Sequence, residues 1–196
     1  MAFVVSIVEG DGDAEAFPVL LHRLWSSVGG RPGLLKTDNP IRVKAQRFLQ
    51  NDTEFRRYIG LAANKAAAAE NGSVIVLLDC EDDCPAKLGP SILDRARAQR
   101  PDVSFFVALA EREYETWFVA AAQSLVAPDG LIAETSAPSD PLRIRNAKGW
   151  LGDRMRGKYR ETLHQPIFSR RMDFQLAMSV ASFVRLHGHI QKLTML

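Results

Sequence analysis

Short apolar runs alternate with longer amphipathic segments along the first part of the chain. The runs are too short for helices and rich in β-branched residues, which is typical of strands in a buried sheet. Ser73–Leu78 is the most apolar run and is expected at the centre of the sheet. Apolar and polar positions alternate between 41 and 46, so this run is expected to be half exposed, at an edge. The predicted strands are Phe3–Val8, Ile41–Ala45, Ser73–Leu78 and Val103–Ala110.

The segments between these runs carry apolar residues at helical spacing, and capping or breaking residues mark their ends. Asp13 is expected to cap the first helix, and proline favours the first turn of the third. The predicted helices run from Asp13 to Gly29, from Asn51 or Asp52 to Gly72, from about Pro90 to Pro101, and from Glu113 to Leu125. Alternating strands and helices predict an α/β fold, with a mainly parallel four-stranded sheet flanked by helices.

The last third of the chain lacks this alternation. Residues 127–148 are rich in Pro, Ser, Ala and Asp and are expected to form a loop. Residues 149–196 are expected to form a basic helical extension packed on the core, residues 1–126. The apolar positions of its last helix, such as Val180, Phe183 and Leu186, predict one buried face.

Charge is distributed unevenly along the 196 residues, although the net charge is only +2. Residues 141–196 hold eleven Lys and Arg against three acids, a net charge of +8, which leaves −6 for the rest. An acidic front and a basic tail suit a protein that binds cations in one place and phosphates in another. Solubility and surface ion pairs explain the same asymmetry equally well.

The composition favours a cytoplasmic globular protein. No apolar run approaches the ~20 residues that a membrane span needs, and the opening segment lacks the basic leader and cleavage site of a signal peptide. We therefore expect no membrane partner. Cys80 and Cys84 are too few soft ligands for a zinc site, so they are expected to be reduced thiols.

Acidic residues follow three of the predicted strands. Because ligands of open α/β sheets bind beyond the carboxyl ends of the strands, these acids are expected at one edge. Crowded carboxylates need either raised pKa values or a cation among them, and oxygen ligands suit Mg²⁺ or Mn²⁺. Each acid taken alone could instead be a helix-end or solvated residue. The acids are Glu9, then Asp79, Glu81 and Asp83, then Glu111, Glu113 and Glu115.

Several other site classes are excluded by missing motifs. The chain has no G-x4-G-K-[ST] phosphate loop, no complete dinucleotide fingerprint and no G-x-S-x-G elbow. A phosphoreceiver-like domain also gathers acids around Mg²⁺, but it requires Ser or Thr after the fourth strand. Ala108 and Ala110 stand there in this chain, which disfavours that class.

Two segments, VEGDGDAEAF after the first strand and VLLDCEDDCP after the third, resemble the paired motifs of Toprim domains. That fold occurs in topoisomerases, primases and nucleases of the overcoming-lysogenization-defect (OLD) type. The chain resembles more closely the Toprim-like bacterial family named domain of unknown function 4276. AEREYETWF, NAKGWL and MDFQLAMSVASF extend this resemblance over nearly the whole chain.

The resemblance implies roles for particular residues. Glu9 would act as general acid or base, and Asp79 with Glu81 would bind Mg²⁺ or Mn²⁺. In the nuclease hypothesis Glu9 is also a ligand of the ion. Glu81 stands where Asp is usual, so Asp83 is an alternative ligand. We expect Glu15, Glu113 and Glu115 as second-site candidates and Lys148 as the residue that stabilises phosphate charge.

The leading hypothesis is therefore an Mg²⁺-dependent nuclease acting on DNA or RNA, the nuclease half of a split ATPase/nuclease system in phage defence. The alternative is a non-catalytic partner or regulator of a separately encoded ATPase, which an exposed apolar patch around Trp117, Phe118 or Trp150 would favour. The nuclease hypothesis requires Glu9 to converge on the Asp79–Glu81 pair.

Overall fold

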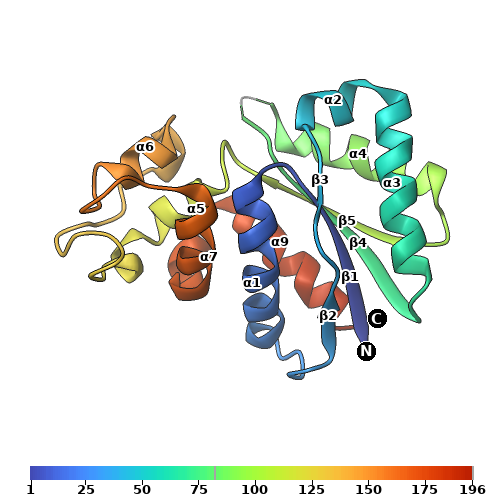
Figure 1. Ribbon diagram of the computed structural model, residues 1–196, viewed down its shortest axis with the longest axis horizontal. Helices are drawn as coiled ribbons and strands as arrows, with labels where there is room; N and C mark the ends of the chain where they lie inside the picture. The colour runs from blue at the N-terminus through green and yellow to red at the C-terminus, as the bar shows by residue number, and fades with distance from the viewer. Residues whose placement is uncertain (82, 196) are drawn as a thin grey trace.

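A parallel β-sheet forms the centre of the protein. In the computed structural model, the described residues, 1–81 and 83–195, fold around five strands that pair in parallel. Their order is β2-β1-β4-β5, and β3 also pairs with β1 (Figure 1). The strands are β1 (Ala2–Val8), β2 (Leu35–Thr37), β3 (Ile41–Arg42), β4 (Asn71–Asp79) and β5 (Ser104–Ala110).

The predicted α/β class and parallel sheet are confirmed, and β4 lies between β1 and β5 as its apolar sequence predicts. The edge differs from the prediction. The short strand β2 was not predicted, and β3 is shorter than the expected run to Ala45. The amide of Val43 still donates to Val8 O (2.9 Å), but Ala45 already begins a helix that buries Phe48 against Phe55.

Helices cover both faces of the sheet because successive strand residues point to opposite sides. Val5 and Ile7 belong to one apolar cluster, together with α2 (Ala45–Gln50), α3 (Asp52–Ala67) and α4 (Pro85–Gln99). Val4 and Val8 belong to the other cluster, which includes α1 (Asp11–Ser27) and α9 (Ala181–Leu193). Figure 1 shows the two helical layers on either side of the strands.

Two helix boundaries differ from the prediction. Helix α4 begins at Pro85, not near Pro90. The N–H groups of a helix's first turn have no acceptor within the helix, so Pro85, which lacks an N–H, loses no hydrogen bond at this position. The expected helix from Glu113 to Leu125 is α5 (Glu115–Ala120) followed by the 3₁₀ turn η1 (Ala122–Leu125). The Ala121 amide donates hydrogen bonds to both Trp117 O and Val119 O, and the backbone tightens from an α-helix to a 3₁₀ turn at this point.

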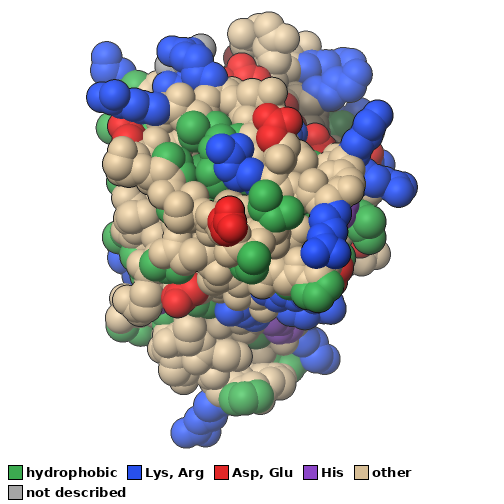
Figure 2. Space-filling view, turned by 90° about the vertical axis from the view of Figure 1, so that its left-hand side faces the viewer, with side chains coloured by type: hydrophobic (Ala, Val, Ile, Leu, Met, Phe, Trp, Pro, Cys, Tyr) green, Lys and Arg blue, Asp and Glu red, His purple; other side chains and the backbone are tan. Residues whose placement is uncertain are grey.

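The C-terminal third adds four short helices beside the core. They are η2 (Pro141–Arg143), a 3₁₀ turn, with α6 (Ala147–Gly152), α7 (Glu161–Arg171) and α8 (Phe174–Ala177), which precede α9. Helix α7 lies along α1, and Arg23 of α1 donates to Ser169 O (2.7 Å) and Met172 O (3.0 Å) at its end. In Figure 2, Lys and Arg side chains are scattered over this side of the molecule and do not form one patch.

Large aromatic side chains fill the junction between the core and these helices. Trp117 and Phe118 are fully buried and Trp150 is partly buried, so the first two form no exposed apolar patch. Cys80 is buried and Cys84 exposed, and both thiols are free. None of the helices in the described part of the chain has the length and apolar character to cross a bilayer.

The close approach of α1 and α7 at Gly12 generates a prediction. A Cβ at this position would overlap Gln165 Oε1 and lie 2.8 Å from Glu161 Cβ. Gln165 is buried and hydrogen-bonded, so it cannot move aside freely. We expect Gly12→Ala to lower the free energy of unfolding by about 1–3 kcal/mol, measured by urea denaturation.

Gly188 in α9 supplies the control. A Cβ there meets no atom within 4 Å, so Gly188→Ala is expected to raise the free energy of unfolding by about 0.5–1 kcal/mol. Equal effects of the two substitutions would contradict the steric account of Gly12.

Candidate functional site

A cleft of about 420 Å³ lies at the carboxyl ends of β1 and β4, where α6 and α7 approach the sheet. It is lined by five of the residues that the sequence singled out: Glu9, Asp79, Glu81, Glu113 and Lys148. Residues that the sequence did not single out as site residues complete the lining: Gly10, Asp13, Arg112, Arg145, Glu161 and Gln165.

Glu9 and Asp13 stand on the turn from β1 into α1. Helix α1 begins at Asp11 and its N-cap is Gly10, so the prediction that Asp13 is the capping residue is wrong. Asp13 lies in the first turn and accepts a hydrogen bond from the Gly10 amide (2.9 Å). The pKa of Glu9 is raised mainly by burial and, to a smaller extent, by repulsion from Asp13. Burial also raises the pKa of Asp13.

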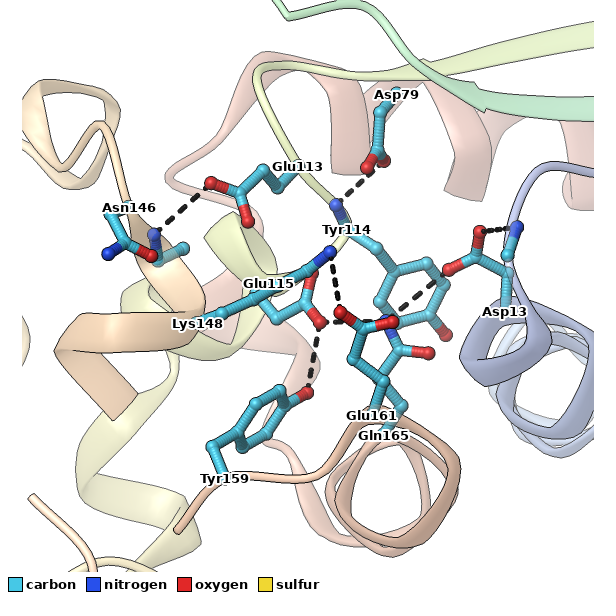
Figure 3. A network of polar contacts seen from close by, with 12 residues as sticks. Asp13, Asp79, Glu113, Tyr114, Glu115, Asn146, Lys148, Tyr159, Glu161 and Gln165 are labelled. Atoms are coloured by element: carbon cyan, nitrogen blue, oxygen red, sulfur yellow. Dashed lines mark hydrogen bonds and ion pairs between the residues drawn. The ribbon is translucent and has the colours of Figure 1, made fainter. Parts of the chain in front are cut away.

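Asp79 is the last residue of β4, and the segment between β5 and α5 holds its side chain in place. Its Oδ1 accepts a hydrogen bond from the Tyr114 amide (2.9 Å), which points the carboxylate into the cleft (Figure 3). Burial, with repulsion from Asp13, Glu115 and Glu9, raises its pKa well above the ordinary value. Asp79 and Glu9 thus lie close enough to oppose each other's ionisation.

Glu81 and Arg112 face each other at the mouth of the cleft in an unusual backbone conformation. Their φ angles are +45° and +66°, in the left-handed region that costs a non-glycine residue about 1–2 kcal/mol. The Glu81 amide donates to Arg112 O (3.1 Å), and the two residues form an isolated antiparallel bridge. The bridge lies two residues beyond the last β4–β5 pair, Asp79 and Ala110, and holds Glu81 in the cleft lining.

A buried polar network lies behind the cleft (Figure 3). Gln165 of α7 donates from Nε2 to Glu115 Oε1 (2.8 Å) and to Asp13 Oδ1 (3.3 Å), so it bridges two carboxylates. Tyr159 also donates to Glu115 Oε1 (3.1 Å). Burial raises the pKa of Glu115 to about 7. Glu115 Oε2 and Gln165 Oε1 have no hydrogen-bond partner among the residues that the structure describes.

Lys148 brings positive charge to this cluster from α6. Asn146 caps this short helix by accepting from the Gly149 amide (2.8 Å), and Glu113 accepts from the Ala147 amide (3.3 Å). The ammonium group lies 2.8 Å from Glu161 Oε1. Partial burial opposes its charge, but Glu115, Glu161 and Asp79 outweigh burial and raise the pKa of Lys148.

Other predicted site residues lie elsewhere. Glu15 and Asp83 are exposed and are not part of the cleft lining. Glu111 holds α9 instead: its Oε2 accepts from the Ser182 amide (3.1 Å), and its own amide donates to Ser182 Oγ (3.2 Å).

The donor set suits a hard divalent cation in kind, since the acidic lining offers carboxylate oxygens and Glu115 keeps a buried, unbonded Oε2. Within residues 1–81 and 83–195, no three His, Cys, Asp or Glu side chains are gathered closely enough to form a complete coordination group. Coordination would therefore require rotation of these side chains within the cleft.

Comparison with known proteins adds two structural neighbours. No protein-family model and no curated protein sequence matches the chain. The structure is similar to the C-terminal region of the Burkholderia pseudomallei OLD protein (TM-score 0.37, 17% identity, 97% of this chain and 98% of that chain). It is also similar to that of the Xanthomonas campestris pv. campestris OLD protein (TM-score 0.37, 14% identity, 98% and 95%). OLD proteins are thus neighbours in structure, whereas the narrower family named from the motifs finds no match.

Gln165, Tyr159 and Glu161 were missed by sequence reasoning. They lie in a mainly helical region with no strand end to mark them. Gln165 contacts Asp13, 152 positions away in the sequence, and Glu115, 50 positions away. Asp13 was assigned to helix capping, and its bond to the Gly10 amide does satisfy the helix start. Its burial at 7% exposure is the feature that separates it from Glu15.

Glu115 generates a prediction about pH dependence. Its pKa is 4.5 in an ordinary environment and about 7 in the folded protein. Between these values the folded state keeps a proton that the unfolded state has released, so the free energy of unfolding falls as pH rises. We expect Glu115→Gln to remove a fall on the order of 2–3 kcal/mol between pH 4.5 and 7.5.

Urea denaturation of wild type and Glu115→Gln at several pH values measures this difference. Glu70→Gln, at an exposed position before β4, is the control and is expected to keep the wild-type pH dependence. Parallel pH profiles for wild type and Glu115→Gln would show that folding does not shift the pKa of Glu115.

Proposed function

We propose that the cleft is the active site of an Mg²⁺- or Mn²⁺-dependent phosphodiesterase acting on nucleic acid. One observation carries the proposal: Glu9, Asp79, Glu81 and Lys148 line one cleft although they come from three separate parts of the chain. Burial first, and repulsion from neighbouring carboxylates second, raise the pKa values of Glu9 and Asp79. A bound divalent cation would supply compensating positive charge.

Glu9, Asp79 and Glu81 would hold the cation, and Asp13 and Glu113 are further carboxylates in the cleft lining. When bound, such a cation polarises a phosphodiester and lowers the pKa of a water beside it. Glu9 would also be the candidate proton acceptor, because its carboxylate lines the cleft beside the other acids. Asp83 and Glu15 would contribute only through movement of exposed chain.

Lys148 would bind the substrate phosphate. Its ammonium is fixed beside Glu161 and keeps its charge at all physiological pH values, since its pKa is raised. A fixed cation stabilises the additional negative charge that develops on a phosphate during displacement. Arg112 and Arg145 also line the cleft and bring further positive charge near the same group.

Substitution of the carboxylates tests the proposal. Purified protein is incubated with plasmid, single-stranded DNA and RNA in Mn²⁺ or Mg²⁺. We expect Glu9→Gln and Asp79→Asn each to lower the cleavage rate by at least about 100-fold, since each removes a cation ligand. The side-chain oxygen introduced by Asp79→Asn can still accept the hydrogen bond from the Tyr114 amide, so we expect the local fold to be kept.

Glu70→Gln, at the opposite end of β4, is the matched control and is expected to cleave like wild type. Mn²⁺ binding, followed by electron paramagnetic resonance, should weaken in the two cleft variants and not in the control. Cleavage that survives both cleft substitutions would remove these residues from the mechanism.

Lys148→Met provides a separate test of phosphate stabilisation. We expect kcat to fall by about 10²–10³-fold while Mn²⁺ binding is retained, because the ammonium acts on the phosphate and not on the cation. A loss of Mn²⁺ binding equal to that of Asp79→Asn would indicate instead that Lys148 only holds the carboxylates in place.

A further inference from the structure

A second cleft of about 380 Å³ adjoins the candidate active site. Glu9 lines both clefts and therefore stands at their boundary. The second cleft is formed by the segment after β3 together with α2 and α3. Its polar and aromatic lining is Glu9, Arg42, Lys44, Arg47, Phe48, Glu54 and Tyr58.

The backbone after β3 fixes two of the basic residues on the outer surface. Val43 is 4% exposed and its amide donates to Val8 O (2.9 Å), so the chain is still paired with β1 at this point. Because neighbouring residues of an extended chain point to opposite sides, Arg42 and Lys44 both face away from the core. Arg42 ends β3 and pairs with Val8, directly before Glu9, and Lys44 follows two residues later as the N-cap of α2.

Positive charge is in excess in this cleft. Arg47 contacts Glu54 (3.0 Å), and Arg42 contacts Asp11, yet the two arginine side chains remain 66% and 55% exposed. Lys44 is exposed and has no ion-pair partner among the residues that the structure describes. Exposed ion pairs contribute little stability, so an incoming phosphate can compete with Asp11 and Glu54 for these side chains.

An aromatic side chain completes the wall. Tyr58 is half-buried, its ring packs edge-on against Phe48 (6.4 Å between centroids), and the Arg57 guanidinium lies 5.4 Å from its centroid. The ring is therefore held in place, and its remaining surface lines the cleft. Cationic groups beside a fixed aromatic ring are the combination by which single-stranded nucleic acids are bound without base pairing.

We propose that this second cleft binds one nucleotide of a single-stranded nucleic acid, its phosphate on Lys44 and Arg47 and its base against Tyr58. The neighbouring phosphodiester then lies across Glu9 in the acidic cleft. The identity of this ligand rests on the proposed function, but its binding does not require catalysis.

Binding of a fluorescein-labelled oligothymidylate, followed by fluorescence anisotropy in EDTA and again in Ca²⁺, tests the subsite. We expect Lys44→Gln/Arg47→Gln to weaken binding about tenfold or more at low salt. The dependence of affinity on salt should also become shallower, since each lost phosphate contact removes about 0.7 from the slope. Tyr58→Ala is expected to weaken single-strand binding by about fivefold or more and to leave duplex binding unchanged.

Lys36→Gln on β2 is the matched control for Lys44→Gln, because it also removes one lysine charge, at the opposite end of the sheet, where β2 pairs with the start of β1. It is expected to bind like wild type. Lys44→Gln alone, at an exposed position, tests the subsite should the double variant fold poorly. Wild-type affinity in the Lys44 and Arg47 variants overturns the proposal, and equal effects of Tyr58→Ala on single and double strands overturn the assignment of the base.

The two proposals fail separately. Hydrolysis of bis(p-nitrophenyl) phosphate in Mn²⁺, compared between wild type and Glu9→Gln, reports on the acidic cleft with a substrate that lacks a flanking nucleotide. Absence of this activity together with loss of oligonucleotide binding in the Lys44 and Arg47 variants would refute the phosphodiesterase and support the subsite.

Discussion

Burial of carboxyl groups around one lysine is the constraint on which the site depends. Glu9, Asp13, Asp79 and Glu115 all lose hydration on folding, and each has a raised pKa for that reason first. Lys148 is attracted to this cluster and lowers the cost of ionising its members. The single positive charge of Lys148 does not balance the negative charges of four ionised carboxylates. Protonation of the carboxyl groups or binding of cations is therefore favoured in the folded protein.

The charged cluster is built from segments far apart in the chain. The carboxylates come from the strand ends and the start of α1, while Lys148, Tyr159 and Gln165 come from the C-terminal helices. Gln165 bridges Asp13 and Glu115 only because α7 approaches α1 at Gly12, where a side chain would not fit. The C-terminal helices therefore complete the cleft and set the spacing of its acids.

Basic side chains lie close to the acidic centre of the cleft. Glu81 and Arg112 keep a left-handed backbone at the mouth. These conformations persist because the hydrogen bond from the Glu81 amide to Arg112 O and the adjoining strands hold them. On the other side of Glu9, the segment after β3 presents Arg42 and Lys44 to solvent. The acidic centre thus lies between two groups of basic side chains, an arrangement suited to a polyanion that runs across it.

The sequence by itself determined the α/β class, the central position of β4 and the gathering of Glu9, Asp79, Glu81 and Glu113 in one cleft. These features are local or follow from parallel pairing, because the carboxyl ends of parallel strands meet at one edge and apolar content reports burial. The order of the prolines could not decide where α4 begins, since Pro85 and Pro90 both suit a first turn by sequence alone. Only the tertiary structure decided that Asp13 faces the cleft while Glu15 is exposed, that Glu111 holds α9, and that Gln165 joins two carboxylates. Those outcomes depend on how helices distant in sequence rotate and pack against one another, and no residue pattern within a single segment encodes that geometry.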